Sequence, residues 1–284
     1  MPELPEVEVT RLGLLPVQGA RISAVTIRHH GLRWPIPADL PQRLQGQRVL
    51  QLRRRAKYIL IEIGDISATG EPVCQGVLLL HLGMSGRLCL LERYFAHEKH
   101  DHVDIAFEDG RVIRLRDPRR FGAVLWLDAE PASHPLLSSL GPEPLDAAFD
   151  GHYLQQQLKS RNAAIKTSIM DAHIVVGVGN IYASESLFRA RIHPETPARQ
   201  LTLAQCQLLV AEIKATLQAA LAAGGSSLRD FFGADGNPGY FQQTYYVYGR
   251  TGEPCRVCGQ PINSIRLGQR STFYCATCQP RAFA

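Results

Sequence analysis

The sequence predicts an α+β protein of two domains, because different kinds of segment follow one another along its 284 residues. A short amphipathic stretch opens the chain, β-type alternation dominates to about residue 130, and helical periodicity dominates from about residue 151. Two Cys-x2-Cys pairs near the C-terminus add the pattern of a metal site. With 45% hydrophobic and 20% charged residues, the chain can bury a sizeable core.

Charge and composition narrow the classes of function. The net charge is only +5 at pH 7, but the basic residues cluster, which favours a polyanionic partner. No apolar run reaches the roughly 18 residues of a membrane-spanning helix, and the N-terminus lacks a secretory signal pattern. Seven cysteines, an odd number, favour metal binding with spare thiols over a disulfide framework. We therefore expect a protein of the cytosol.

Residues 3 to about 15 are predicted to form the first helix. Its apolar residues fall on one side of a 3.6-residue period: Leu4, Val7, Leu14 and Leu15. The helix is expected to end around Pro16 and Gly19. It would carry Pro2 at its tip.

The dipeptide Pro2-Glu3 has chemical potential if Met1 is removed. The new terminus is then a secondary amine whose pKa, about 7.7–8.0 in reference peptides, leaves a useful fraction nucleophilic near neutral pH. Attack on a sugar carbon would give an iminium ion, which acidifies the neighbouring carbon and favours elimination. Glu3 is placed beside the amine to transfer protons. The alternative is structural, because proline followed by acidic residues commonly opens a helix.

The segments that follow alternate in the manner of β-strands. Three of them cover residues 22–27, 58–63 and 77–80. Residues 64–76 are interpreted as a loop insertion. The clearest hairpin alternates over 103–107, turns at Asp109-Gly110 and returns through Leu115. Residues 1 to about 130 are thus predicted to be a mainly antiparallel β domain with one helix, of sandwich or barrel type.

Basic residues fall at two places in this domain. They precede the strand at Tyr58 and lie on or after the return strand of the hairpin: Arg53, Arg54, Arg55, Lys57, Arg114, Arg116, Arg119 and Arg120. An arginine face on a strand beside a second basic cluster suits a groove that follows phosphates. An ordinary surface with salt bridges is the alternative for any single arginine. Lys57, next to an apolar strand, is expected to be partly desolvated.

Two apolar residues stand at turns from which a side chain could wedge between stacked bases. Met84 lies between glycines in His81-Leu82-Gly83-Met84-Ser85-Gly86. Phe121 follows Asp117-Pro118-Arg119-Arg120. For Met84, packing in the core is the alternative.

Residues 130–150 contain four prolines and are predicted to be a linker to a largely helical part. Helices are expected at about 151–161, 164–172, 180–190 and 202–222, the last opened by a capping box of Thr202 and Gln205. Gly177-Val178-Gly179-Asn180 leads into a helix N-terminus that could bind a phosphate. Tyr182 takes the place of the third glycine of a dinucleotide fingerprint, so a Rossmann site is not expected. The segment Ser226 to Gly249 is interpreted either as a mobile loop over a base or as a poorly packed connection.

The strongest local pattern is the pair of cysteine knuckles, Cys255-x2-Cys258 and Cys275-x2-Cys278, with 16 residues between them. This spacing predicts one structural zinc ion, because four thiolates leave no position open for water. Residues 262–267 and 271–274 are predicted to form a hairpin that aims Arg270 outward from its tip. The remaining cysteines are expected to be small core residues: Cys74, Cys89 and Cys206.

Together these motifs resemble the formamidopyrimidine-DNA glycosylase family along the whole chain. The segments that carry the resemblance are Pro2-Glu3-Leu4-Pro5-Glu6-Val7, Lys57-Tyr58, His81 to Gly86, Asp117-Pro118-Arg119-Arg120-Phe121-Gly122, Gly179-Asn180-Ile181-Tyr182-Ala183 and the four cysteines. The resemblance implies a catalytic β-sandwich over residues 1–130, a linker over 131–150 and a helix-two-turns-helix DNA-binding domain over 151–224. A lesion-side loop over 225–249 and a zinc-ribbon finger over 250–284 would follow.

The resemblance also implies roles for individual residues. Pro2 would attack the sugar anomeric carbon to form a Schiff base, and Glu3 would donate a proton. Lys57 would assist β-elimination, and Arg270 would bind phosphate and assist δ-elimination. Further DNA contacts would come from His100, Arg119, Arg161 and Asn180, while Met84, Arg119 and Phe121 would fill the space of a flipped base. Arg161 stands where the family usually has lysine, and the 64–76 loop is longer than usual.

The implied activity is base excision repair by a monomeric bifunctional glycosylase and lyase in the bacterial cytosol. Its partner would be double-stranded DNA carrying an oxidised purine, either 8-oxoguanine or a formamidopyrimidine. Two alternatives stay open. One is an enzyme for oxidised pyrimidines, as in the sister endonuclease VIII group, although that group typically opens Pro-Glu-Gly-Pro-Glu and Leu4 replaces the glycine here. The other is a non-catalytic zinc-ribbon protein that binds nucleic acid.

Overall fold

The computed structural model describes residues 2–128, 131–226 and 244–281, and it divides the chain into two compact units. Unit 1 comprises residues 1–138 and 223–240, and unit 2 comprises residues 139–222 and 241–284. The sequence-based prediction of a loop over residues 225–249 falls largely outside the described residues. None of the helices in the described part of the chain combines the length and the apolarity needed to cross a membrane.

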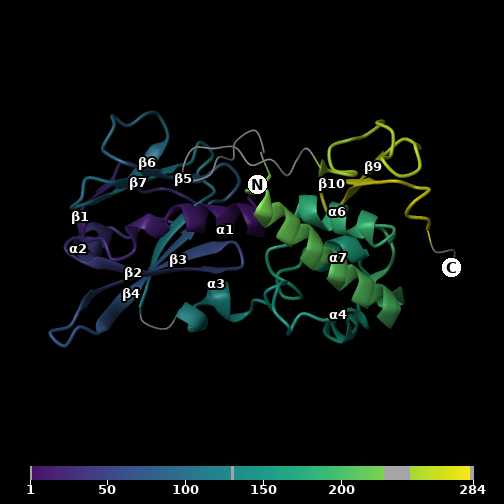
Figure 1. Cartoon of the computed structure of the whole chain (residues 1–284), viewed down its shortest axis with the longest axis horizontal. Coiled ribbons are helices and arrows are strands. Elements are labelled where there is room, and N and C mark those ends of the chain that lie inside the picture. Colours follow the sequence, from purple (N-terminus) through teal and green to yellow (C-terminus); the bar gives the residue numbers. More distant parts are fainter. Residues whose placement is uncertain (1, 129–130, 227–243, 282–284) are drawn as a thin grey trace. The chain divides into compact units, whose positions relative to one another are not determined.

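Unit 1 is a sandwich of two four-stranded antiparallel sheets (Figure 1). The first sheet has the order β1 (Ile22–Ile27), β6 (Asp101–Phe107), β7 (Val112–Arg116) and β5 (Arg87–Leu91). The second has the order β2 (Arg48–Arg55), β3 (Tyr58–Ile66), β4 (Pro72–His81) and β8 (Ala123–Leu127). The unit also contains α1 (Leu4–Gly13), η1 (Leu15–Val17), α2 (Leu40–Leu44), η2 (Pro131–Ser133) and α3 (Pro135–Ser138). The predicted antiparallel β domain with a leading helix is confirmed.

Helix α1 contacts strands of both sheets, namely β2, β3 and β5 (Figure 1). Its buried residue Val7 and its C-cap residue Leu14 join the core between the sheets with side chains such as Ile61 and Leu115. The helical period therefore predicted the buried face correctly, except that Leu15 is 36% exposed. Leu15 begins the 3-10 turn η1, where the helical period no longer applies.

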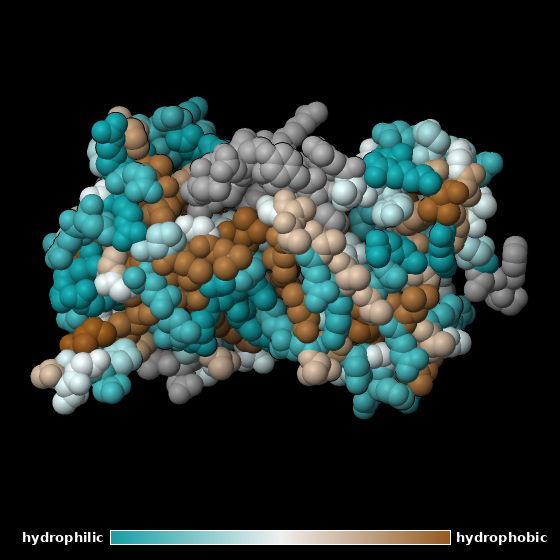
Figure 2. Space-filling view, in the orientation of Figure 1, coloured by the Kyte–Doolittle hydropathy of each residue, from teal (hydrophilic) through white to brown (hydrophobic). Residues whose placement is uncertain are grey.

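The prediction of a loop insertion over residues 64–76 is wrong. Strand β3 continues to Ile66 and pairs with β4 from Pro72, so that the connection covers only residues 67–71. The longer strands were not predicted from the sequence because Gly64 and Gly76 were interpreted as the ends of a loop. Gly64 instead meets the backbone of Val73 so closely that a Cβ would lie 2.0 Å from its carbonyl oxygen. Near the end of this hairpin, Ile66 and Val73 are exposed. Figure 2 shows one face of the molecule, on which apolar residues lie in bands between hydrophilic ones.

Unit 2 is helical and ends in a two-stranded hairpin (Figure 1). Its elements are α4 (Gly151–Leu158), α5 (Ile165–Ile169), α6 (Asn180–Arg189), η3 (Ala198–Gln200), α7 (Leu203–Ala222), β9 (Asn263–Leu267) and β10 (Arg270–Tyr274). The long helix α7 packs against α4 and α6, and α6 packs against β10. The predicted capping box opens α7, since the backbone N–H of Gln205 donates to Thr202 Oγ1 at 3.2 Å and the N–H of Thr202 donates to Gln205 Oε1 at 3.0 Å.

The carboxylate of Glu185 ties α6 to the segment that leads into the zinc hairpin. This buried side chain of α6 accepts backbone N–H groups from Tyr246, Val247 and Tyr248 at 2.8, 3.0 and 2.9 Å. Burial raises the pKa of Glu185, and the three N–H donors oppose that rise. Helix α6 is thereby held to the segment that precedes the cysteine knuckles within unit 2.

Candidate active site and zinc site

Pro2 and Glu3 lie at the N-terminal end of α1, as the sequence predicted. Both residues are buried, and Glu3 is the N-cap of the helix. A capping box holds it, because the Glu3 side chain accepts the N–H of Glu6 while Glu6 Oε2 accepts the N–H of Glu3 at 2.8 Å. The positive end of the helix dipole therefore faces the Glu3 side chain.

Glu6 has a second partner that is distant in sequence. Its Oε1 accepts the backbone N–H of Ser226 at 2.8 Å, also within unit 1. Each carboxylate oxygen of this fully buried side chain thus accepts at least one N–H group. Glu6 joins the helix tip that carries Pro2 to the segment that follows α7. Glu6 was not predicted as a site residue, although the Glu3-x-x-Glu6 spacing of a capping box is visible in the sequence.

Lys57 lies in the tight turn between β2 and β3 and is half-buried, as expected. Ala56 before it has a left-handed backbone, with φ of 54°, and its carbonyl accepts Arg54 Nη1 at 3.0 Å. The positive charge of Lys57 acts on His81, the last residue of β4. Burial first, and then the positive charges of Lys57 and Arg33, lower the pKa of His81 to about 4. His81 is therefore neutral at pH 7, and its Nδ1 accepts the N–H of Gly83 at 3.0 Å.

The structure brings together the two turns that were predicted to carry wedge residues. Met84 is 40% exposed and Phe121 is 45% exposed, so neither is a core residue. The Arg119 guanidinium lies over the Phe121 ring at 4.8 Å. A Cβ on Gly83 would lie 2.4 Å from the backbone of Phe121, so only glycine permits this approach of the two turns.

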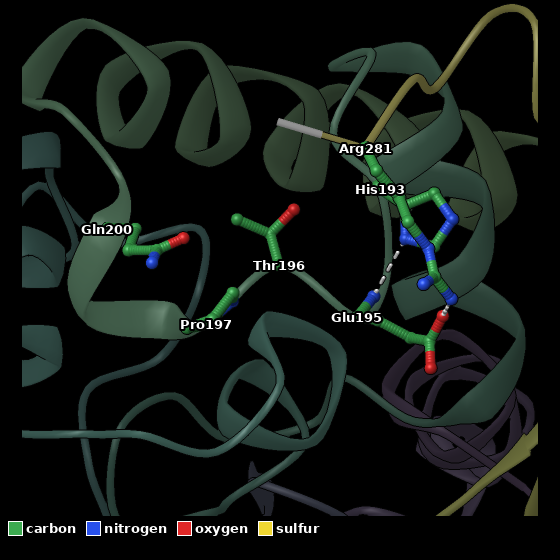
Figure 3. A pocket seen from close by; sticks show the side chains of 6 residues that line it. All are labelled: His193, Glu195, Thr196, Pro197, Gln200 and Arg281. Carbon is green, nitrogen blue, oxygen red and sulfur yellow. Dashed lines mark hydrogen bonds and ion pairs between the residues drawn. The ribbon is translucent and has the colours of Figure 1, made fainter. Parts of the chain in front are cut away.

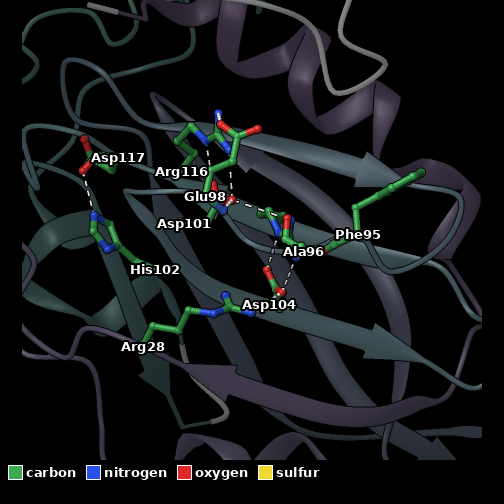
Figure 4. Close-up of polar contacts among 10 residues, drawn as sticks. Arg28, Phe95, Ala96, Glu98, Asp101, His102, Asp104, Arg116 and Asp117 are labelled. Carbon is green, nitrogen blue, oxygen red and sulfur yellow. Dashed lines mark hydrogen bonds and ion pairs between the residues drawn. The ribbon is translucent and has the colours of Figure 1, made fainter.

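The prediction of a phosphate-binding face on the return strand of the hairpin is wrong for Arg114 and Arg116. Arg114 is buried and bonds both carboxylate oxygens of Asp104 at 2.8 and 2.7 Å. Arg116 bonds Asp101 at 2.6 and 2.9 Å, and Arg28 also reaches Asp104 at 2.7 Å (Figure 4). Carboxylates on β6 thus pair with these arginines. This result agrees with the alternative interpretation, in which the arginines form ordinary salt bridges.

His100 immediately precedes β6 and has a left-handed backbone with φ of 76°. Among the described residues, five residues other than glycine have positive φ, and four of them are predicted site residues or neighbours of one: Ala56, His100, Arg120 and Gln269. Such backbone is costly for residues with a Cβ and concentrates at functional sites. The strain thus supports the choice of these segments as candidate site.

In unit 2, Asn180 is the first residue of α6, as predicted. Its amide donates to the carbonyl of Ser271 at 2.9 Å and its Oδ1 accepts the ammonium of Lys166 at 2.6 Å. Lys166, which is 1% exposed, also donates to Thr272 Oγ1 at 2.6 Å. Lys166 was not predicted as a site residue, although a lysine within the apolar pattern of a helix was a visible signal.

Arg270 is exposed at the start of β10 rather than at the turn itself. It lines a cavity of about 280 Å³ that also includes Lys166 and Asp171. Arg161 forms an ion pair with Asp171 at 2.8 Å. The three predicted DNA contacts of unit 2, Asn180, Arg161 and Arg270, are thus linked through shared neighbours.

The four cysteine sulfurs lie within 4.8 Å of one another. Two Sγ···Sγ distances are 3.9 Å (Cys255 to Cys278) and 3.4 Å (Cys258 to Cys275), close to the roughly 3.8 Å edge of a tetrahedron with Zn–S bonds of about 2.3 Å. The four residues therefore fit one structural zinc, and the prediction is confirmed.

A second cavity in unit 2, of about 300 Å³, contains no predicted site residue. It is lined by His193, Glu195, Thr196, Pro197, Gln200 and Arg281 (Figure 3). Arg281 is paired with Glu195, and His193 Nδ1 accepts the N–H of Glu195 at 3.3 Å. Its polar groups are thus largely engaged with one another.

Comparison with known proteins assigns each region of the chain. The formamidopyrimidine-DNA glycosylase N-terminal domain matches residues 1–124, the H2TH domain of the same family matches 140–232, and a zinc finger found in FPG and IleRS matches 252–281. The β-sandwich, the helical unit and the cysteine site therefore define a DNA glycosylase.

The chain belongs to the formamidopyrimidine-DNA glycosylase family. It is 67% identical to the formamidopyrimidine-DNA glycosylase of Methylobacillus flagellatus over 98% of this chain and 96% of that protein. The Cupriavidus pinatubonensis relative is 55% identical, over 98% of this chain and its own full length. Among solved structures, the Lactococcus lactis protein has a TM-score of 0.89 at 34% identity, and the Thermus thermophilus protein 0.85 at 35%; each match covers 99% of this chain and 100% of the other.

Proposed function

We propose that this glycosylase removes oxidised purines, 8-oxoguanine and formamidopyrimidines, from double-stranded DNA. The observation that carries the proposal is the Pro2-Glu3 pair at the capped tip of α1, in a chain that matches this family from end to end. A mutant of the Lactococcus lactis relative was crystallised with DNA containing a formamidopyrimidine, and a MutM protein with DNA containing a carbocyclic 8-oxoguanine.

The reaction starts when the target nucleotide leaves the stack, because its glycosidic bond is unreachable inside the duplex. Once Met1 has been removed, the freed Pro2 amine forms a bond to the anomeric carbon and loses its proton, while the bond from that carbon to the base breaks and the departing base takes up a proton. Glu3 acts as the proton donor. Ring opening of the sugar gives an iminium ion that links Pro2 to the DNA.

Elimination then cuts the strand. The iminium ion withdraws electrons, so a proton leaves the neighbouring carbon and the bond to the 3′ phosphate breaks. Lys57 assists this β-elimination, and Arg270 holds phosphate and assists the second, δ-elimination. The zinc ion supplies no reactive position, because four thiolates close its coordination shell; it stabilises the hairpin that carries Arg270.

The remaining site residues bind DNA in this proposal. His100, Arg119, Arg161 and Asn180 contact the strand, while Met84, Arg119 and Phe121 occupy the space left by the flipped nucleotide. Affinity then falls steeply with added salt, since phosphate contacts release counterions. We further propose that the enzyme works as a monomer in the bacterial cytosol, associated with the nucleoid; light scattering in solution should give the mass of one chain, 31.5 kDa.

Borohydride trapping tests the proposal on two duplexes, one with 8-oxoguanine opposite cytosine and one with thymine glycol. The second is included because a Lactococcus lactis relative was also crystallised with DNA containing an oxidised pyrimidine. We expect an adduct on the first duplex that peptide mapping places on Pro2. Trapping only on thymine glycol would assign a pyrimidine substrate, and undiminished strand cleavage by Pro2→Gly would remove Pro2 as nucleophile.

A further inference from the structure

Two buried polar side chains lie beneath the turns that present Met84 and Phe121. Ser85 is 7% exposed and Asp117 is fully buried. The Ser85 hydroxyl donates to Asp117 Oδ1 at 2.8 Å, although the two residues are 32 positions apart. Neither residue belongs to a strand or a helix.

The pair also holds the backbone on both sides of Phe121. Ser85 Oγ accepts the N–H of Arg119 at 3.1 Å, and Asp117 Oδ2 accepts the N–H of Gly122 at 2.8 Å. One hydroxyl and one carboxylate thus connect the first turn to the second, before and after the aromatic ring. We call this arrangement, formed by Ser85 and Asp117, the turn clip.

The turn clip is itself attached to the sandwich. The backbone N–H of Asp117 donates to the carbonyl of His100 at 3.0 Å, and its carbonyl bonds His102 Nε2 at 2.9 Å (Figure 4). On the far side, the carbonyl of Gly122 accepts the N–H of Arg33 at 3.0 Å. The base of both turns is therefore fixed while the tips stay exposed.

We propose that Ser85 and Asp117 are positioning residues that make the two turns act as one rigid wedge during extrusion of the damaged nucleotide. The proposal rests on the proposed function. A side chain that enters the base stack is pushed out as the bases restack, so it must be held from below. A loose turn would let Met84 and Phe121 withdraw separately, and a displacement of about 1 Å can slow a reaction on the order of 100-fold.

The wedge is needed to extrude a base but not to react with a sugar that has already lost its base. The test therefore compares two reactions of Ser85→Ala with wild type. One is single-turnover excision of 8-oxoguanine; the other is borohydride trapping on a preformed abasic site. We expect excision to slow about 10-fold and trapping to change less than about 2-fold. Ser85→Thr, which keeps the hydroxyl, should recover most of the excision rate.

A fluorescent probe reports the wedge directly. With 2-aminopurine opposite a tetrahydrofuran abasic analogue, insertion of the wedge unstacks the probe and raises its emission. Ser85→Ala should give a smaller rise at saturating enzyme. The matched control is Ile105→Val, which removes a methyl group from the buried core of β6 and lowers stability without touching the turns. It should keep the wild-type ratio of the two rates.

Wild-type excision and emission by Ser85→Ala would overturn the proposal, as would an equal fall of both reactions in Ser85→Ala and Ile105→Val. If Ser85→Ala does not fold, Asp117→Asn serves instead. Its amide can accept from Gly122 and donate to Ser85, but it leaves the serine proton without an acceptor, so a smaller split between the two rates is expected; no split would again refute the proposal. If the wild-type protein neither excises 8-oxoguanine nor is trapped on the abasic site, that result refutes the proposed function and does not bear on the role of the turn clip.

Discussion

Replacing Lys166 with methionine tests how unit 2 holds its predicted DNA contacts. The Lys166 ammonium donates to Asn180 Oδ1 and Thr272 Oγ1, each at 2.6 Å, and to the carbonyl of Ser271 at 3.2 Å. It thereby joins α5 to the first residue of α6 and to β10 of the zinc hairpin. Methionine fills a similar volume but has no donor.

The expected loss of stability follows from the acceptors left behind. Ser271 keeps the amide of Asn180 as a donor at 2.9 Å, so Asn180 Oδ1 and Thr272 Oγ1 lose most. A buried group left without its hydrogen bond costs about 1–3 kcal/mol. Removal of a buried charge from an almost fully buried site offsets part of this cost. We expect the free energy of unfolding to fall by about 2 kcal/mol.

Urea unfolding followed by far-UV circular dichroism suits this variant. Both tryptophans, Trp34 and Trp126, lie in unit 1, so tryptophan fluorescence would report mainly on the wrong unit. Affinity for a tetrahydrofuran duplex should also fall about 10-fold, since about 1.4 kcal/mol of lost binding is a tenfold change. Zinc content should stay at one ion per chain.

The matched control is Lys214→Met. Lys214 of α7 makes one exposed hydrogen bond, to the carbonyl of Asp146 at 2.8 Å, so its loss should change stability by less than about 0.5 kcal/mol. Equal effects of Lys166→Met and Lys214→Met on unfolding and on DNA affinity would refute the reasoning.

Three further predictions concern the zinc site, pH and the helix tip. Cys255→Ser should lose zinc, by metal analysis, and DNA affinity together; full affinity without zinc would show that the ion does not position the hairpin. His81 has a pKa of about 4 in the folded protein and about 6.5 in the unfolded chain, so the free energy of unfolding should fall by about 3 kcal/mol as the pH is lowered from 6.5 to 4. His81→Asn should make the free energy of unfolding less dependent on pH over this range. An unchanged pH dependence in the variant would contradict this prediction. In Glu6→Gln the single amide oxygen can replace only one of the two carboxylate oxygens that accept the N–H groups of Glu3 and Ser226. The free energy of unfolding should therefore fall by about 2 kcal/mol, and borohydride trapping should be slower. Unaltered trapping would show that Glu6 does not support the chemistry of Pro2.

Local patterns predicted the elements whose causes are local. The helices around residues 151–158, 180–189 and 203–222 follow from apolar periodicity and capping signals, and the structure confirms them. Four thiols at the right spacing predicted the zinc site because the metal needs those ligands whatever surrounds them. The roles of Pro2, Glu3 and the DNA contacts came from resemblance to a family and remain predictions.

Charge pairing could not be predicted in the same way. Arg114 and Arg116 alternate with apolar residues just as a phosphate-binding strand would, but their carboxylate partners stand on the neighbouring strand β6. Only the register of β6 against β7 decides that these arginines meet Asp101 and Asp104 rather than DNA. The same holds for residues 64–76, whose pairing as strands depends on a partner across the hairpin.

The sequence alone determined that a β part precedes a helical part, where the metal site lies and which segments carry reactive or basic groups, because these depend on neighbours a few positions apart. The tertiary structure decided which buried polar groups form hydrogen bonds and with which partners. Ser85 meets Asp117 across 32 residues, Lys166 meets Thr272 across 106 and Glu6 meets Ser226 across 220. Such partners are chosen by packing and by the cost of burying an unpaired polar group, and neither is visible until the chain is folded.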